Sequence, residues 1–148
     1  MPRIERTADV VWEGNVARGV GSLSAGSGAF TALGYSLPTR IGQPEGKTSP
    51  EELLAAAHGG CLAMALAGEL SGADTPPGRL EVHCLIVMDE LEGRGHQIVS
   101  SQVDIVAAVD GLDANALQAA VAKADEGCPF SELLRRAGCE VNVSARLA

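Results

Sequence analysis

The clearest pattern in the chain is the long apolar run that follows Ser49. Ser49 suits an N-cap, Pro50 suits the first helical position, and Glu52 stands three residues after the serine, which completes a capping box. The Ala- and Leu-rich run that follows predicts a helix to about Leu70. Apolar residues point in nearly every direction around this helix, so we expect it to be buried on all sides.

Two adjacent glycines, Gly59 and Gly60, interrupt this helix and indicate that another backbone approaches it closely. Stretches of alternating or β-branched residues on both sides of the helix predict strands. The predicted strands cover residues 8–24 (a hairpin turning at 13–15), 32–41, 80–90, 97–109 and 140–147. A polar loop at 42–48 leads into the helix.

Two further helices are predicted before the last strand. Asp113 is a good N-cap for a helix through about Glu126 that ends at Gly127. Cys128 and Pro129 then begin a short second helix, with the proline in a first-turn position. Strands followed by mixed helices and strands define an α+β fold, and no repeat or linker divides residues 1–148, so we expect one domain.

Composition narrows the function classes. Hydrophobic residues make up 46% of the chain but aromatic residues only 3%, which disfavours a surface for stacking bases. The net charge of −8 disfavours binding to nucleic acid or to anionic membrane surfaces. We find no apolar run of membrane-span length and no signal-type N-terminus, so we expect a cytoplasmic protein. In that reducing compartment, the four cysteines are not expected to form structural disulfides.

Two of these cysteines, Cys61 and Cys128, lie on predicted helices. Cys61 lies about three turns into its helix, where the helix dipole has faded, so a thiolate there needs a neighbouring cation. Cys128 occupies an N-cap-like position, where free backbone N–H groups lower a thiol pKa. Local sequence alone therefore favours Cys128 as the attacking thiol.

The motifs LPTRIGQPEGKTSPEELLAAAHGGCLAMAL and GCPFSELL, preceded by WEGNVARGVGSLS, resemble the OsmC/Ohr family of thiol peroxidases over nearly the whole chain. The placement of TRIG shortly before TSPEELL is similar to the osmotically inducible protein C branch. The resemblance implies an OsmC-like fold: N-terminal antiparallel strands, a long buried central helix, further strands and C-terminal helices. It also implies an interlocked homodimer with active sites at the interface.

The resemblance further implies residue roles. Cys61 resembles the peroxidatic thiol and Cys128 the resolving thiol, which reverses the order that local sequence favours. Arg40 and Glu51 resemble the polar pair that serves the first cysteine, with Arg40 stabilising thiolate and peroxide and Glu51 orienting Arg40. Leu62 departs from the family, in which an aromatic residue often follows the cysteine. The implied cycle reduces organic hydroperoxides, with hydrogen peroxide as a second candidate substrate, and needs no metal or other cofactor. An external dithiol, such as a dihydrolipoyl protein, restores the thiols.

Spacing adds a hypothesis about the origin of the polar pair. Glu51 and Cys61 are ten residues apart, about 15 Å along a helix, and point about 80° apart. One straight helix cannot bring both side chains to one oxygen, so we expect a composite site in which Glu51, and Arg40 with it, comes from a partner subunit. A bent helix or a long Arg40 bridge are the alternatives.

Other interpretations compete with a thiol enzyme. Buried cysteines are most often inert small hydrophobes, and packing is the expected role of Cys84 and Cys139. His58, three residues before Cys61, is expected to be a helix-packing or supporting residue rather than half of a metal site. The rival functions are a non-catalytic domain that binds a small apolar ligand, and a redox sensor whose disulfide alters a partner interaction.

Overall fold

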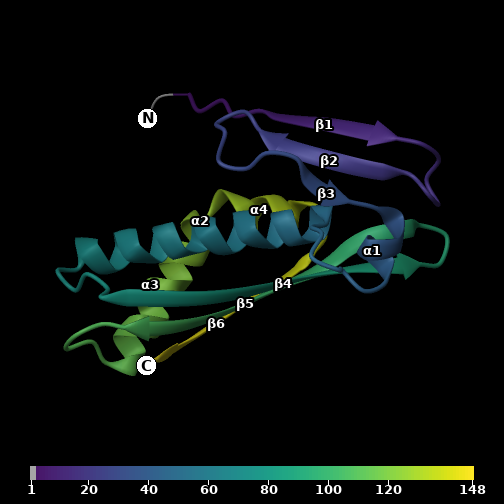
Figure 1. Ribbon diagram of the computed structural model, residues 1–148. Coiled ribbons are helices and arrows are strands. Elements are labelled where there is room, and N and C mark those ends of the chain that lie inside the picture. Colours follow the sequence, from purple (N-terminus) through teal and green to yellow (C-terminus); the bar gives the residue numbers. More distant parts are fainter. Residues whose placement is uncertain (1–2) are drawn as a thin grey trace. The chain divides into compact units, whose positions relative to one another are not determined.

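The computed structural model describes residues 3–148, which divide into two compact units (Figure 1). The first unit extends to Pro50, and the second covers Glu51–Ala148. The first unit contains a three-stranded antiparallel sheet and a short helix. The second contains three helices on a three-stranded mixed sheet, so the predicted α+β class is confirmed.

The first unit begins with the predicted hairpin. Its strands are β1 (Ala8–Glu13), β2 (Val20–Ala25) and β3 (Leu33–Tyr35), paired in the order β1-β2-β3. The predicted turn at 13–15 is too short, because the second strand begins only at Val20. Asn15 accepts hydrogen bonds from the backbone N–H groups of Arg18 at 3.0 Å and Gly19 at 2.6 Å, which closes a longer loop first.

The prediction of an extended segment over residues 32–41 is wrong in its second half. After β3 the chain forms a short helix, α1 (Leu37–Ile41), which carries Arg40. Ser36 is its N-cap: its hydroxyl accepts a hydrogen bond from the Thr39 backbone N–H at 3.3 Å and lies 2.8 Å from the Thr39 hydroxyl. With Pro38 in the first turn, the segment has the same helix-start chemistry as Ser49 and Pro50.

The second unit is built on α2 (Pro50–Gly72) and a sheet in the order β4-β5-β6. The strands β4 (Arg79–Leu91) and β5 (Gly95–Ala108) form a long antiparallel hairpin, and β6 (Glu140–Leu147) pairs with β5 in parallel. Between β5 and β6 the chain forms α3 (Ala114–Gly127) and α4 (Pro129–Arg136). The Asp113 carboxylate caps α3 by accepting from the Ala116 N–H at 2.8 Å, as predicted.

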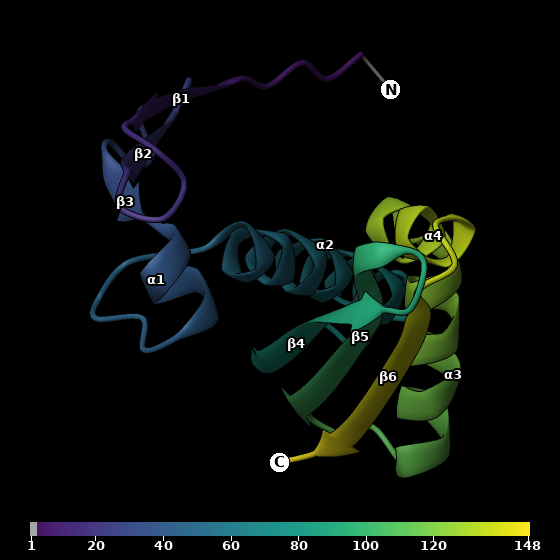
Figure 2. The same cartoon turned by 90° about the vertical axis from the view of Figure 1, so that its right-hand side faces the viewer.

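All three helices lie on one face of this sheet (Figure 2). Alternation along the strands explains this arrangement, because successive side chains point to opposite faces. On β5, every second residue from Ser101 to Ala107 is buried under the helices, while Gln102 and Asp104 are exposed. The core joins these strand residues to leucines of α2 and to α3 and Cys128.

The expectation that α2 is buried on all sides is wrong for the single chain. Its inner face is buried and packs on the sheet, whereas an outer face at every fourth residue is exposed. The inner face consists of His58, Gly59, Leu62, Leu66 and Leu70. The outer face consists of Glu52, Ala56, Gly60, Met64 and Gly68. Apolar composition on both faces therefore does not mean burial on both faces within one chain.

The two glycines of α2 fall on different faces. A Cβ on Gly59 would lie 3.3 Å from Cys84 Cβ and 3.5 Å from Val82 Cγ1, so the helix approaches β4 closely there, as predicted. A Cβ on Gly60 would meet no atom within 4 Å. Only Gly59 therefore has a packing reason within the second unit.

Among the helices of residues 3–148, α2 is long and apolar enough to cross a membrane, judged only by length and composition, with a mean hydropathy of 1.5. The expectation that no run reaches this length is therefore wrong. A core helix of a globular domain satisfies the same two criteria. Because Leu62, Leu66 and Leu70 on its inner face form the core of the second unit, we interpret α2 as a core helix.

Candidate active site

The second unit brings Cys61 and Cys128 together although they come from different helices. Cys61 lies on the third turn of α2 and is half-buried. Cys128 is the N-cap of α4 and is fully buried, and its interaction with Cys61 raises the pKa of the Cys61 thiol. All four cysteines of the chain are free. Two reduced thiols in contact, one of them partly exposed, can be oxidised to a disulfide.

The start of α4 also supplies a polar contact to Cys61. The predicted N-cap position of Cys128 is confirmed, but its side chain makes no capping hydrogen bond. A backbone hydrogen bond from Phe130, in the first turn of α4, reaches Cys61 instead and lowers the pKa of that thiol. The free N–H groups of this helix start therefore act on Cys61 from a neighbouring helix.

The net effect on Cys61 is nevertheless a raised pKa. Burial raises it most, the hydrogen bond and charge of Cys128 raise it further, and the Phe130 N–H offsets only part of this. A thiol in this setting needs a positive charge nearby to act as a thiolate at neutral pH. That requirement agrees with the expectation that Cys61 depends on a cation.

The expected polar pair is divided between the two units. Arg40 lies on α1 of the first unit, on an exposed position, and Glu51 lies in the first turn of α2. Because Glu51 and Cys61 share one continuous helix, the axial separation of about 15 Å holds. Action of Arg40 and Glu51 on Cys61 stays a prediction.

His58, expected to be a helix-packing or supporting residue, is both packed and hydrogen-bonded. It is fully buried on the inner face of α2 and both ring nitrogens have partners. Nδ1 lies 2.8 Å from the Ser101 hydroxyl on β5, and Nε2 lies 2.9 Å from the Ser131 hydroxyl on α4. Ser101 also lies 3.6 Å from the Cys84 sulfur. This network ties α2, β5 and α4 together beside the two thiols.

An ion pair between α3 and α4 lies near the same network. Arg135 forms a two-pronged ion pair with Asp125, with N–O distances of 3.2 and 2.5 Å. Asp125 raises the pKa of His58 and Arg135 lowers it, and the Cys128 thiol contributes to the raised pKa of Arg135.

Sequence reasoning missed Phe130, Ser131, Asp125 and Arg135. For Phe130 and Ser131 the available signal was the predicted start of the second short helix at Cys128 and Pro129, because first-turn N–H groups are free to bond to a neighbouring element. No comparable local signal marks Asp125 or Arg135, which lie near the ends of α3 and α4.

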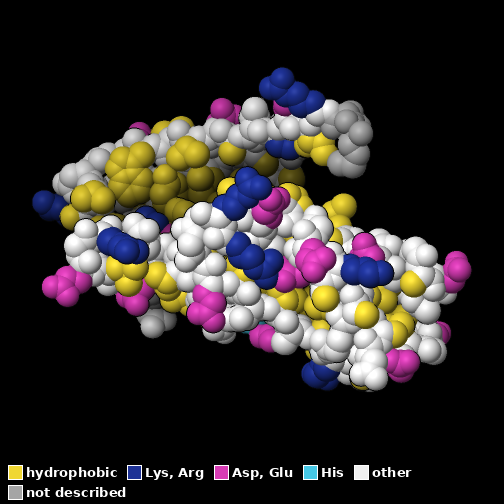
Figure 3. All heavy atoms as spheres, turned by 180° about the vertical axis from the view of Figure 1, so that it is seen from behind, with side chains coloured by type: hydrophobic (Ala, Val, Ile, Leu, Met, Phe, Trp, Pro, Cys, Tyr) yellow, Lys and Arg dark blue, Asp and Glu magenta, His cyan; other side chains and the backbone are white. Residues whose placement is uncertain are grey.

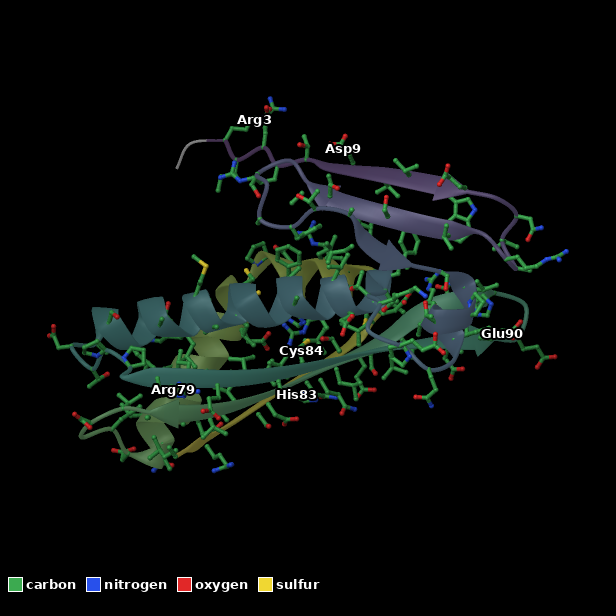
Figure 4. The ribbon with its side chains drawn as sticks, viewed as in Figure 1. Arg3, Asp9, Arg79, His83, Cys84 and Glu90 are labelled. Atoms are coloured by element: carbon green, nitrogen blue, oxygen red, sulfur yellow. The ribbon has the colours of Figure 1, made fainter. Side chains whose placement is uncertain are left out.

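Cys84 and Cys139 are not members of the Cys61–Cys128 pair. Cys84 lies on the α2 side of β4, while His83 points to the opposite side (Figure 4). Cys139, just before β6, is buried, and burial followed by the charge of Glu140 raises its pKa. Their expected packing role is consistent with these positions.

A cavity of about 410 Å³ lies between α2 and β4. Its lining consists mainly of small apolar residues and includes Cys84, but neither Cys61 nor Cys128. The lining residues are Glu52, Ala55, Ala56, Gly59, Gly60, Ala63, Leu80, Val82, His83 and Cys84. This cavity therefore lies along the helix that carries Cys61 but not at the thiol pair.

Charges and possible metal ligands add little to the site. On the face drawn in Figure 3, basic side chains lie among acidic ones and form no continuous basic surface. Within residues 3–148, no three His, Cys, Asp or Glu side chains are grouped so that they could hold a metal ion. The chemistry that the arrangement supports is that of paired thiols.

Comparison with known proteins agrees with this fold. The family model described as OsmC-like protein matches residues 42–144. Over 132 residues, 89% of this chain and 91% of the relative, the chain is 33% identical to peroxiredoxin OsmC of Escherichia coli K12. The fold therefore defines a class of redox protein related to peroxiredoxins.

Solved structures share the same fold. An organic hydroperoxide resistance protein OsmC from Legionella pneumophila has a TM-score of 0.70 and 23% identity, with 99% of each chain covered. An organic hydroperoxide resistance protein from Elizabethkingia anophelis has a TM-score of 0.76 and 21% identity, with 100% of each chain covered. The chain belongs to the OsmC family, and the predicted OsmC-like fold is confirmed.

Proposed function

We propose that the chain is a cysteine-based peroxidase that reduces organic hydroperoxides in the cytoplasm and protects against oxidative stress. The observation that carries this proposal is the thiol pair formed by the partly exposed Cys61 on α2 and the buried Cys128 at the start of α4. Membership of a family with a peroxiredoxin among its members supports it. No metal or bound cofactor is needed for the proposed reaction.

In the proposed cycle, the Cys61 thiolate attacks the distal oxygen of the hydroperoxide and the O–O bond breaks. The leaving alkoxide takes up a proton and departs as an alcohol, and Cys61 is oxidised to a sulfenic acid. Cys128 attacks that sulfur, hydroxide leaves as water, and a Cys61–Cys128 disulfide forms. An external dithiol, such as a dihydrolipoyl group on a protein, supplies two electrons and two protons to restore both thiols.

The order of roles follows from exposure and hydrogen bonding. Cys61 is the partly exposed member of the pair, whereas Cys128 has 0% exposure, so a peroxide reaches Cys61 first. The Phe130 N–H also stabilises a thiolate on Cys61. Both observations support Cys61 as peroxidatic and Cys128 as resolving.

Arg40 and Glu51 complete the proposed site in a homodimer. Because the pKa of Cys61 is raised within its own unit, the proposed thiolate needs a positive charge close to its sulfur, and Arg40 supplies it with Glu51 as its counterion. The exposed apolar outer face of α2 suits contact with a second copy. If the site is composite, mixed dimers of Cys61→Ser and Arg40→Ala chains regain activity.

The test is consumption of an organic hydroperoxide with a dithiol reductant. We expect Cys61→Ser to lose activity by about 10³-fold or more, because it removes the nucleophile, and Cys128→Ser to lose turnover after one oxidation. Cys139→Ala, a buried cysteine away from the pair, is the matched control and keeps activity. Full activity in Cys61→Ser would refute the mechanism, and loss only in Cys128→Ser would exchange the two roles.

A further inference from the structure

His58 occupies the position on α2 from which the start of α4 is held. It lies three residues before Cys61 on the same helix and has 0% exposure. A fully buried imidazole is costly unless both nitrogens are hydrogen-bonded. Here Nδ1 is 2.8 Å from Ser101 and Nε2 is 2.9 Å from Ser131, so both requirements are met.

The ring is neutral in this setting. Burial lowers the pKa of His58, while Asp125 on α3 raises it and Arg135 on α4 lowers it again. A neutral imidazole donates from one nitrogen and accepts at the other, so the two serine hydroxyls adopt complementary roles. The hydrogen bonds from His58 to Ser101 on β5 and to Ser131 on α4 therefore have fixed and opposite donor and acceptor roles at the ring.

Ser131 lies in the first turn of α4. The two groups that act on Cys61 precede it in the chain, and the rest of the helix follows it. Cys128 is the N-cap of that helix and Phe130 immediately precedes Ser131. The Cys128 side chain makes no capping bond that would fix this turn locally. A displacement of Ser131 therefore moves both the Cys128 thiol and the Phe130 N–H relative to Cys61.

We propose that His58 is a positioning residue that fixes the first turn of α4 on α2 through Ser131, with Ser101 orienting the ring. The network thereby sets the distance between the two thiols and the aim of the Phe130 N–H at Cys61. This inference deepens the proposed function, because the same alignment governs both thiolate formation on Cys61 and closure of the disulfide.

Two measurements test the proposal without any peroxide. The first is the pH profile of alkylation at Cys61 by iodoacetamide, resolved for each cysteine by peptide mass spectrometry. The second is the rate at which diamide, which accepts two electrons and two protons from the thiols, drives formation of the Cys61–Cys128 disulfide. Both remain valid if the chain proves not to be a peroxidase, whereas hydroperoxide turnover would then fail in the wild type as well.

We expect Ser131→Ala to shift the Cys61 alkylation profile to higher pH, because the Phe130 N–H is no longer held in line. It should also slow disulfide formation by about tenfold or more, since a small misplacement of reacting groups is costly. His58→Asn keeps an amide near the Nδ1 position but loses the bond to Ser131, so its alkylation profile and disulfide rate should match those of Ser131→Ala. His58→Gln places an amide near Nε2 and should recover part of the rate.

Leu70→Ala is the control for a purely structural effect. Leu70 is buried on the same face of α2 but lies far along the helix from Ser131, with 1% exposure. It should lower thermal stability while leaving the alkylation profile and the diamide rate unchanged. The proposal is overturned if Ser131→Ala changes neither measurement, or if Leu70→Ala changes both as much as Ser131→Ala does.

Discussion

The two faces of α2 both carry apolar residues but have different surroundings. The inner face packs on the sheet and carries His58, whereas Met64 on the outer face has 78% exposure. Hydrophobicity therefore identifies α2 as a helix that must be covered but does not identify what covers each side. Within the second unit, the inner face alone is covered by the chain itself.

This difference also separates structural from chemical roles. Hydrogen bonds from the inner face reach β5 and the start of α4, and we propose that these bonds position the groups around Cys61. In the proposed dimer, the outer face contacts a second copy of the chain. The comparison can be tested by paired substitutions, one on each face.

The largest expected effect separates the two faces by stability. Leu66→Ala should lower the free energy of unfolding by about 2–5 kcal/mol, because it leaves a cavity at a fully buried position. Met64→Ala should change the free energy of unfolding of the dissociated chain by about 0.5 kcal/mol or less. Urea unfolding at several protein concentrations measures both.

Concentration dependence sharpens this result. A Met64→Ala loss that is present at high protein concentration and vanishes on dilution would place a second copy on the outer face. A loss equal to that of Leu66→Ala at every concentration would contradict the assignment of the two faces.

Much of the fold could be predicted from the sequence because its signals are local. The capping residues Asp113 and Pro129 and the alternation along β4 and β5 mark elements that the structure confirms. The same chemistry at Ser36 and Pro38 was overlooked, so Arg40 was placed in an extended segment instead of α1.

The site was predictable only in part because its geometry is tertiary. The motifs indicated Cys61 and Cys128 as a pair, and the structure brings them together. The bonds of His58 to Ser101 and Ser131 join residues from three separate elements, so no spacing along the chain reveals them. Burial of α2 likewise depends on which face meets the sheet, which composition does not encode.

A smaller effect tests the comparison at adjacent residues. Gly60→Ala should raise the free energy of unfolding by up to about 1 kcal/mol, because alanine is the better helix former and the added Cβ meets nothing within 4 Å. At Gly59 the same gain is offset by a Cβ placed 3.3 Å from Cys84 Cβ. Thermal melts of both variants give the difference. Equal stabilisation at both positions would show that α2 does not approach β4 closely at Gly59.

The last expected effect is a pH dependence of the free energy of unfolding that arises from His58 on the inner face. Burial holds the pKa of His58 below its ordinary value of 6.5, so the unfolded chain binds more protons than the folded one as the pH falls. The stability contribution is therefore complete above pH 6.5 and declines as the pH falls through 6.5 towards the folded-state pKa. Its slope does not exceed about 1.4 kcal/mol per pH unit.

His58→Asn should flatten this slope between about pH 7.5 and pH 5.5, because the variant has no imidazole to protonate. Urea unfolding across that range measures it, with His83→Asn as the matched control because His83 is on the exposed side of β4. A slope that persists in His58→Asn but disappears in His83→Asn would show that the pH-sensitive group lies on the exposed side of the sheet. The inner face would then hold the helices without responding to protons.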